Sequence, residues 1–261
     1  MDAVTTYDRL VQARDEAGAG FIVLIDPDKT PVSQLPQLVE QCVDAGVDAL
    51  FIGGSLLHGT AFQAYVSALK ALSPLPIIGF PGSINQIAPD LDAILYLSIV
   101  SGRNPDYLFG RHIQAAPIIK AMNVEPISTG YMLVESGHIT TALYMSNTMP
   151  LPRRKPDVAA ATALAAEMMG MRMLFTDGGS GADQPVPIEI IAAITETCTV
   201  PLIVGGGLRT PDAIETRVAA GAGFVVVGTA FEQHPDTIYL AEMVAATRRA
   251  TAVDMRAFAS S

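Results

Sequence analysis

The 261-residue sequence predicts an α/β fold, namely a single (β/α)8 TIM barrel that occupies residues 1–261 as one domain. Its residues are 50% hydrophobic and 16% charged, a composition that favours one large buried core. A barrel of this type takes about 250 residues. Short apolar runs also recur along the chain, each followed by a polar or glycine-rich turn and then by a stretch with helical spacing. These repeats of strand and helix favour a closed barrel over an open doubly wound sheet.

Eight apolar runs are the candidate strands, and most of them are apolar at nearly every position. Continuous apolar character indicates burial on both faces, as in parallel strands that are covered by helices. The runs are Phe21 to Asp26, Ala49 to Gly54, Pro76 to Phe80, Ala93 to Val100, Ile127 to Val134, Met173 to Asp177, Pro201 to Gly205 and Phe224 to Gly228.

Helical spacing is found between these runs, and proline at or near several starts supports the helices. Examples are Val32 to Ala45, Pro156 to Met169, Pro187 to Thr197 and Pro211 to Ala220. The segment Glu135 to Pro152 instead predicts a hairpin or long loop, which would form a lid or an interface. Neither a linker nor a solenoid repeat divides the chain, so we expect one domain.

The formal net charge of -10 and the pI near 4.7 argue against a nucleic-acid partner and against attraction to anionic lipid surfaces. Apolar runs are far shorter than the roughly 20 residues that span a bilayer, and the first residues lack the pattern of a secretory signal. Cys42 and Cys198 lie far apart without CxxC spacing, which indicates buried thiols. We expect a cytoplasmic protein with at most peripheral membrane contact.

Glycine-rich turns after the seventh and eighth runs are the strongest local signal. Gly206 and Gly207 follow one strand, and Gly228 and Thr229 follow the other. Glycines let the backbone approach a phosphate, which the N–H groups at a helix start then bind. Tight turns alone would also explain the glycines, but their place in a barrel favours a phosphate site. The turns do not identify the reaction, because flavin-binding and sugar-phosphate barrels share them.

Asp26 and Ser55 end the first and second runs, where strand-end side chains point into the mouth of a barrel. A carboxylate and a hydroxyl that face one cavity can hold Mg²⁺ while diphosphate oxygens and water complete its coordination. Capping of the following helix is the alternative role for these side chains. We favour the cap for Asp28 and the metal for Asp26.

The block Phe175-Thr176-Asp177-Gly178-Gly179-Ser180-Gly181 ends the sixth run. The carboxylate of Asp177 would lie at the mouth as a general base for a substrate hydroxyl, with neighbouring N–H groups on a phosphate. An Asx-turn without a catalytic role is the alternative, because aspartate before glycine often forms one. None of the four histidines has ligand spacing typical of a zinc site.

Taken together, several blocks resemble the geranylgeranylglyceryl phosphate synthase family, which includes the heptaprenylglyceryl phosphate synthases. In that family an oxygen of glycerol 1-phosphate attacks the allylic carbon of a prenyl diphosphate, so that an ether forms and pyrophosphate leaves. The blocks are LIDPDK from Leu24, FIGGS from Phe51, YMSNTMPLP from Tyr144, FTDGGSGA from Phe175, VGGGLRTP from Val204 and VVGTAFE from Val226.

The resemblance implies a Mg²⁺-dependent prenyltransferase of phospholipid biosynthesis that joins sn-glycerol 1-phosphate to geranylgeranyl diphosphate. It implies that Asp26 and Ser55 bind the metal and that Asp177 deprotonates the attacking hydroxyl. The residues implied to contact glycerol phosphate are Phe175, Thr176, Asp177, Gly178, Gly179, Ser180, Gly181, Gly206, Gly207, Gly228 and Thr229. We also expect a homo-oligomer, although the sequence pattern does not indicate its size.

The block at the end of the sixth run departs from the family pattern at two positions. The family block usually begins Tyr-Leu-Glu-Ala-Gly, whereas Phe175 lacks the tyrosine hydroxyl and Asp177 is one methylene shorter than glutamate. Tyr131 ends the fifth run and is a candidate gate for the apolar channel that a prenyl tail needs, although its spacing alone favours a packing role. The alternatives are a flavin- or sugar-phosphate-binding barrel enzyme and a barrel that binds a phosphoryl ligand without catalysis.

Overall fold

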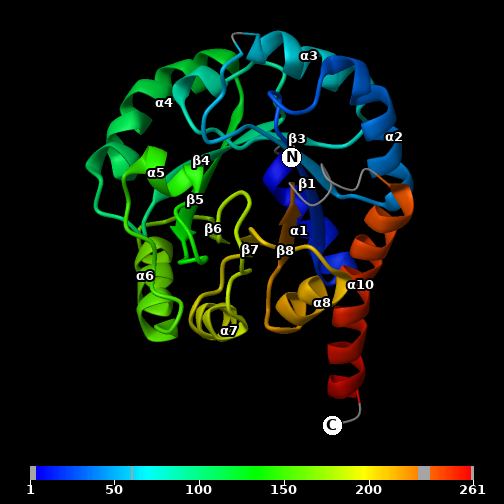
Figure 1. Ribbon diagram of the computed structural model, residues 1–261, viewed down its shortest axis with the longest axis vertical. Coiled ribbons are helices and arrows are strands. Elements are labelled where there is room, and N and C mark those ends of the chain that lie inside the picture. Colours follow the sequence, from blue (N-terminus) through cyan, green and yellow to red (C-terminus); the bar gives the residue numbers. More distant parts are fainter. Residues whose placement is uncertain (1–3, 60, 229–235, 260–261) are drawn as a thin grey trace.

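The structure is a computed structural model that describes residues 4–59, 61–228 and 236–259. Eight parallel strands pair in chain order, and β8 closes on β1 to complete a barrel (Figure 1). The predicted TIM barrel is confirmed, and each predicted run overlaps one strand. The strands are β1 (Gly20–Ile25), β2 (Ala49–Ile52), β3 (Ile77–Gly79), β4 (Ala93–Ile99), β5 (Glu125–Leu133), β6 (Met173–Asp177), β7 (Leu202–Gly205) and β8 (Phe224–Val227).

Side chains alternate along each strand between two apolar layers. Phe51 and Phe175 belong to the cluster inside the barrel, whereas their neighbours Leu50 and Leu174 belong to the cluster between strands and helices. This alternation is the period of a β-strand, whose successive side chains point to opposite faces. Both faces are buried, which explains the nearly continuous apolar character of the strands.

Helices surround most of the barrel (Figure 1). Their bounds are α2 (Leu35–Ala45), α3 (Phe62–Leu72), α4 (Arg111–Met122), α6 (Pro156–Met168), α7 (Ile188–Thr197), α8 (Pro211–Ala219) and α10 (Thr237–Ala259). The helix predicted from Val32 begins with a short 3-10 helix, η1 (Val32–Gln34), before α2. At the start of α8, the Thr210 side chain accepts a hydrogen bond from the Ala213 amide, and Pro211 occupies the first turn.

The expected helix after β3 is absent, which corrects the simple repeat of strand and helix. Between Gly79 and Ala93 the structure has only a 3-10 helix, η2 (Ile84–Gln86). Pro81, Gly82 and Pro89 interrupt this short segment, so it has no stretch long enough for a stable α-helix. As a result, the connection from β3 to β4 supplies no covering α-helix.

A helix before the first strand, α1 (Thr6–Ala17), covers the amino-terminal end of the barrel. Its Leu10 side chain is buried in the cluster inside the barrel. The Glu125 carboxylate, at the start of β5, accepts hydrogen bonds from the backbone N–H groups of Thr6 at 2.6 Å and Tyr7 at 3.3 Å. Since these contacts close that end, a ligand has access to the barrel from the carboxyl ends of the strands.

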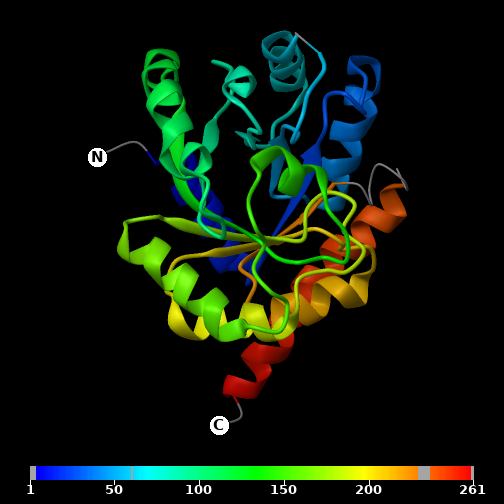
Figure 2. The ribbon, with the colours of Figure 1, turned by 60° about the vertical axis from the view of Figure 1, so that its left-hand side comes forward.

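The segment from Glu135 to Pro152 is not wholly a loop or hairpin, because it contains the six-residue helix α5 (Thr141–Ser146). Thr140 caps this helix, and an isolated bridge pairs Val134 with Leu151. Figure 2 shows α5 beside the carboxyl ends of the strands, in the position expected for a lid. A five-residue π-helix, η3 (Asp106–Gly110), leads into α4.

Both cysteines are buried thiols, as predicted. Burial raises the pKa of Cys42 to about 12, so its thiol is uncharged at neutral pH. Among the described residues, no helix is both long enough and apolar enough to cross a membrane.

Candidate active site

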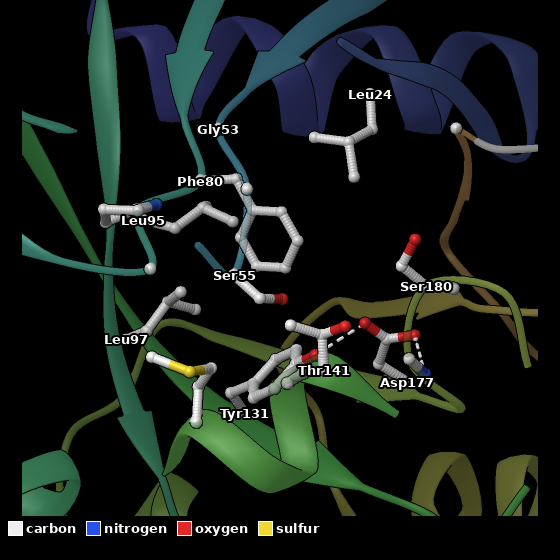
Figure 3. A pocket seen from close by; sticks show the side chains of 18 of the residues that line it. Leu24, Gly53, Ser55, Phe80, Leu95, Leu97, Tyr131, Thr141, Asp177 and Ser180 are labelled. Carbon is white, nitrogen blue, oxygen red and sulfur yellow. Dashed lines mark hydrogen bonds between the residues drawn. The ribbon is translucent and has the colours of Figure 1, made fainter. Parts of the chain in front are cut away.

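A cavity of about 550 Å³ opens at the carboxyl ends of the strands (Figure 3). It is lined by residues from loops that are far apart in the sequence, and these residues include most of those predicted to bind ligands. The predicted site residues on its wall are Asp26, Ser55, Tyr131, Phe175, Asp177, Gly179, Ser180, Gly181, Gly206, Gly207 and Gly228. The fold therefore brings these segments together at one mouth, where parallel strands end.

The cavity has a polar side and an apolar side. Figure 3 shows Asp177 and Ser180 on one side and Leu95 and Leu97 on the other. The apolar lining continues from β4 to α4, where Ile119 is a wall residue. A ligand that fits this cavity would carry a polar group and a hydrocarbon portion.

Two hydrogen bonds hold the carboxylate of Asp177. The Tyr131 hydroxyl donates to Oδ2 at 2.5 Å, and the Gly179 amide donates to Oδ1 at 2.7 Å (Figure 3). Burial raises the pKa of Asp177, and the hydrogen bonds from Tyr131 and Gly179 partly oppose that rise. A buried carboxylate with a raised pKa is a stronger base than an exposed aspartate. Asp177 thus forms the Asx-turn that was the alternative interpretation, and the same carboxylate is also placed to act as a base.

The turn after β7 packs directly against this carboxylate. Gly206 has a φ of 78°, a backbone conformation that residues other than glycine rarely adopt. A Cβ atom on Gly206 would also lie 2.6 Å from Asp177 Oδ1 and 2.7 Å from the Gly178 nitrogen. Glycine is therefore required here on two counts, and it lets the β6 and β7 turns form one surface.

Aromatic rings pack beneath the polar side of the cavity. Phe175 is paired in register with Tyr131 on the neighbouring strand, and its ring stacks on Phe80 with centroids 5.2 Å apart. The Tyr131 ring meets Phe175 edge to face, with centroids also 5.2 Å apart. Tyr131 is 4% exposed, and its hydroxyl is directed to Asp177. The structure thus gives Tyr131 a polar partner that its position in the sequence did not predict.

Asp26 and Ser55 lie on adjacent loops. A Cβ atom added to Gly54, the residue before Ser55, would lie 3.4 Å from Asp26 Oδ1. The ammonium of Lys29 is 3.4 Å from Asp26 Oδ2. Figure 3 shows the Ser55 hydroxyl directed into the cavity.

These donors suit a hard cation that also binds a phosphorylated ligand. Magnesium is commonly held by one or two protein oxygens together with substrate phosphates and water. No group of three or more histidine, cysteine, aspartate or glutamate residues is placed to hold a metal within the described part of the chain. Asp26 and Ser55 therefore fit a Mg²⁺ site in which phosphate oxygens of the ligand and water supply the remaining coordination.

Asp28 does not cap the following helix, contrary to expectation. Its carboxylate accepts hydrogen bonds from the backbone amides of His58 at 2.7 Å and Gly59 at 3.3 Å, in the loop after β2. The residue before α2, Gln34, makes no side-chain cap, and neither does Pro31 before η1. Asp28 instead joins the first two loops of the barrel mouth.

Two other residues that were predicted to contact glycerol phosphate do not line the cavity, and a third lies outside the described residues. The Thr176 side chain is fully buried, and its hydroxyl donates to the Ile203 carbonyl, away from the cavity. Gly178 does not line the cavity either. Thr229 lies outside the described residues, so its predicted contact stays a prediction.

Several residues on or beside the wall were not identified from the sequence. Phe80 and Met145 line the cavity, and Thr141 at the start of α5 does so as well. Buried Gln86 in η2 contacts the backbone of the Gly53–Ser55 turn. The local sequence contains no signal for this role of Gln86, because its partner Gly54 lies 32 positions away.

The matched family model covers residues 11–247 and is described as the PcrB family. The chain belongs to the PcrB family. A protein of Chitinophaga pinensis named geranylgeranylglyceryl phosphate synthase is 40% identical over 247 residues, which are 95% of this chain and 97% of that protein. A protein of the same name from Spirosoma linguale is 45% identical over 218 residues, 84% of this chain and 88% of its own.

A solved structure from Thermoplasma acidophilum has the same architecture. It is a (S)-3-O-geranylgeranylglyceryl phosphate synthase in complex with its substrate sn-glycerol-1-phosphate. The TM-score is 0.89 at 30% identity, with 95% of this chain and all of that chain covered. The resemblance that the sequence blocks indicated is therefore confirmed for the whole barrel.

Proposed function

We propose that this PcrB-family protein is a prenyltransferase that joins sn-glycerol 1-phosphate to geranylgeranyl diphosphate. The observation that carries the proposal is one cavity in which a buried carboxylate and glycine-rich turns face an apolar wall. The relatives with 40–45% identity bear the name of this enzyme, which supports the same activity here.

The polar side of the cavity suits glycerol 1-phosphate. Gly206, Gly207 and Gly228 leave the backbone accessible to a phosphate, since no Cβ atom covers it. Asp177 would accept the proton of the attacking glycerol hydroxyl, and Tyr131 would steady the carboxylate. Phe175 offers no hydroxyl to the phosphate, so Ser180 and the backbone would carry that contact.

The apolar side suits a prenyl tail. The missing helix after β3 leaves space between β4 and α4, and the wall there includes Ile94, Tyr96 and Ile119. Burial of a long hydrocarbon chain contributes about 0.8 kcal/mol for each CH₂ group removed from water. An isomerase or epimerase of small sugar phosphates would not need this extension.

Asp26 and Ser55 are proposed to hold Mg²⁺ with the diphosphate. When bound there, Mg²⁺ would supply neutralisation of the charge that develops on the leaving group. Lys29, 3.4 Å from Asp26, adds positive charge at the same place.

The reaction balances without any further reagent. The glycerol oxygen forms a bond to the allylic carbon while the bond from that carbon to the diphosphate oxygen breaks. The hydroxyl proton goes to Asp177, and the bonding electrons leave with pyrophosphate.

The decisive experiment incubates the purified protein with sn-glycerol 1-phosphate, geranylgeranyl diphosphate and Mg²⁺. We expect pyrophosphate release and, in mass spectrometry, an ether product whose mass equals the sum of the two substrates less pyrophosphate. The enantiomer sn-glycerol 3-phosphate is the matched control and should react far more slowly. Shorter and longer prenyl diphosphates measure the chain preference, and EDTA tests the metal. Absence of a prenylated product with every pairing would refute the proposed function.

A further inference from the structure

Gln86 lies in the 3-10 helix that replaces the missing α-helix, and its side chain is 2% exposed. Its Oε1 atom accepts hydrogen bonds from the backbone amides of Gly54 at 3.1 Å and Gly82 at 3.2 Å. Its Nε2 group donates to the Gly54 carbonyl at 2.8 Å. One side-chain amide thus binds both the N–H and the C=O of Gly54, as a neighbouring strand would.

The loops after β2 and β3 approach too closely for side chains. A Cβ atom on Gly53 would lie 2.0 Å from the Phe80 carbonyl oxygen, and one on Gly82 would lie 2.3 Å from the Gly54 carbonyl oxygen. The last ladder bond between the strands runs from the Phe80 amide to the Ile52 carbonyl at 2.8 Å. Beyond it, Gln86 continues the pairing of the two loops.

This contact has a consequence for the cavity, because Ser55 follows Gly54 directly and the Asp26 carboxylate lies beside Gly54. The chain has no α-helix between β3 and β4, where η2 is the only helical element. The turn is thus held by the amide of Gln86 on one side and, on the other, by the hydrogen bond from the Gly53 amide to the Ile25 carbonyl at 3.1 Å.

We propose that Gln86 is a positioning residue for the diphosphate half of the active site, an inference that rests on the proposed prenyl transfer. It acts through the Gly53–Ser55 turn, which it holds so that the Ser55 hydroxyl and the Asp26 carboxylate serve the same metal–diphosphate group. The glycerol phosphate half is built on the turns after β6, β7 and β8, and the side-chain hydrogen bonds of Gln86 go to Gly54 and Gly82 instead.

The test compares Gln86→Met and Gln86→Glu with the matched variants Gln63→Met and Gln63→Glu, since Gln63 is an exposed glutamine on α3. We expect Gln86→Met to raise the KM for prenyl diphosphate and the half-saturating Mg²⁺ concentration by roughly tenfold, the effect of one buried hydrogen bond or more. The KM for glycerol 1-phosphate should stay near that of the unmodified protein. A general loss of stability would not separate the two substrates in this way.

The Gln86→Glu variant adds a second signature. An ionised carboxylate can accept from both amides but cannot donate to the Gly54 carbonyl, whereas a protonated carboxyl can do both. The deficit of Gln86→Glu relative to the unmodified protein at the same pH should therefore shrink as the pH is lowered, and that of Gln86→Met should not. This comparison remains available if Gln86→Met fails to fold.

Hydrogen exchange provides a readout that does not need activity. The amides of Gly54 and Gly82 should exchange faster in Gln86→Met, which removes their acceptor, and remain unchanged in the Gln63 variants. Unchanged exchange, or an equal rise in KM for both substrates, would overturn the positioning role. If the unmodified protein forms no product, the proposed function is refuted. The exchange result would still decide whether Gln86 holds the turn.

Discussion

At the scale of single residues, the carboxylate of Asp177 is bound at both oxygens and buried. Tyr131 donates to one oxygen and Gly179 to the other, so the carboxylate has a fixed orientation toward the cavity. The same burial that raises its pKa keeps it ready to accept a proton. Burial also holds the pKa of Tyr131 well above its ordinary value, so its hydroxyl stays protonated as a donor.

Replacement of Asp177 by asparagine should remove the base and keep the shape. We expect Asp177→Asn to lower kcat by about 10² to 10⁴-fold, the usual contribution of a general base. Asp183→Asn is the matched control, because Asp183 lies in the same loop with an exposed side chain that pairs with His138 at 2.9 Å. Steady-state kinetics check both variants, and a near-normal kcat for Asp177→Asn would remove this residue from the mechanism.

The pH profile follows from the raised pKa of Asp177. As the pH falls through that pKa the base becomes protonated, so kcat/KM should decline on an acid limb that lies above 3.8, the ordinary value for aspartate. The Tyr131 hydrogen bond favours the charged form and lowers the pKa. Tyr131→Phe should therefore move the acid limb to higher pH. An unchanged limb in a folded Tyr131→Phe variant would show that another group titrates.

At the scale of elements, a half-buried charge pair joins the last helix to the start of the first two strands. Arg248 on α10 donates to both carboxylate oxygens of Asp48, at 2.9 and 2.8 Å, and also to the Ala19 carbonyl. Asp48 in turn accepts from the Phe21 amide at 2.6 Å. Residues that are far apart in the sequence thus join α10 to the amino-terminal ends of β1 and β2.

Removal of this charge should destabilise the barrel. We expect Arg248→Met, which keeps an apolar side chain, to lower the free energy of unfolding by about 1–3 kcal/mol because Asp48 loses a charged partner. The adjacent Arg249 is a matched control, since its ion pair with Glu215 is long, at 3.6 Å, and exposed. Arg249→Met should change stability by less than about 0.5 kcal/mol. Denaturant unfolding measures both, and equal effects would contradict the assignment.

At the scale of the whole molecule, the proposed function would require a protein with a net charge of -10 to bind two anionic substrates. Long-range electrostatics oppose their approach, so affinity has to come from local donors. The two halves of the cavity would solve this differently, with backbone N–H groups for the monophosphate and a cation for the diphosphate. The barrel places both sets of donors at one end because all its strands are parallel.

Thermal melting tests this division of the cavity. At a concentration of about 100 times its Kd, sn-glycerol 1-phosphate should stabilise the protein by about 2.7 kcal/mol. For a domain of this size that corresponds to a rise in Tm of roughly 5–10 °C. EDTA should leave this shift intact and abolish the shift caused by a non-reactive prenyl thiodiphosphate. Loss of the glycerol phosphate shift in EDTA would show that the metal binds in the glycerol phosphate half, which contradicts the proposed division of the cavity.

Much of the fold could be predicted because its signals are local. The strand pattern reflects burial on both faces, and residues such as Asp26, Ser55 and Asp177 could be assigned to one mouth because parallel strands end together. The absent helix after β3 was missed because the expected repeat outweighed Pro81, Gly82 and Pro89. Helix α5 was missed because six residues give too little periodicity.

The sequence by itself determined the barrel, its strand order and the kind of residue at each strand end, since those follow from hydrophobic period and chain direction. Only the tertiary structure decided which groups touch. The hydrogen bond from Tyr131 to Asp177 spans 46 positions, and that from Gln86 to Gly54 spans 32. Such pairs depend on strand register and on loop approach to within a few tenths of an ångström, and neither is encoded in a local pattern.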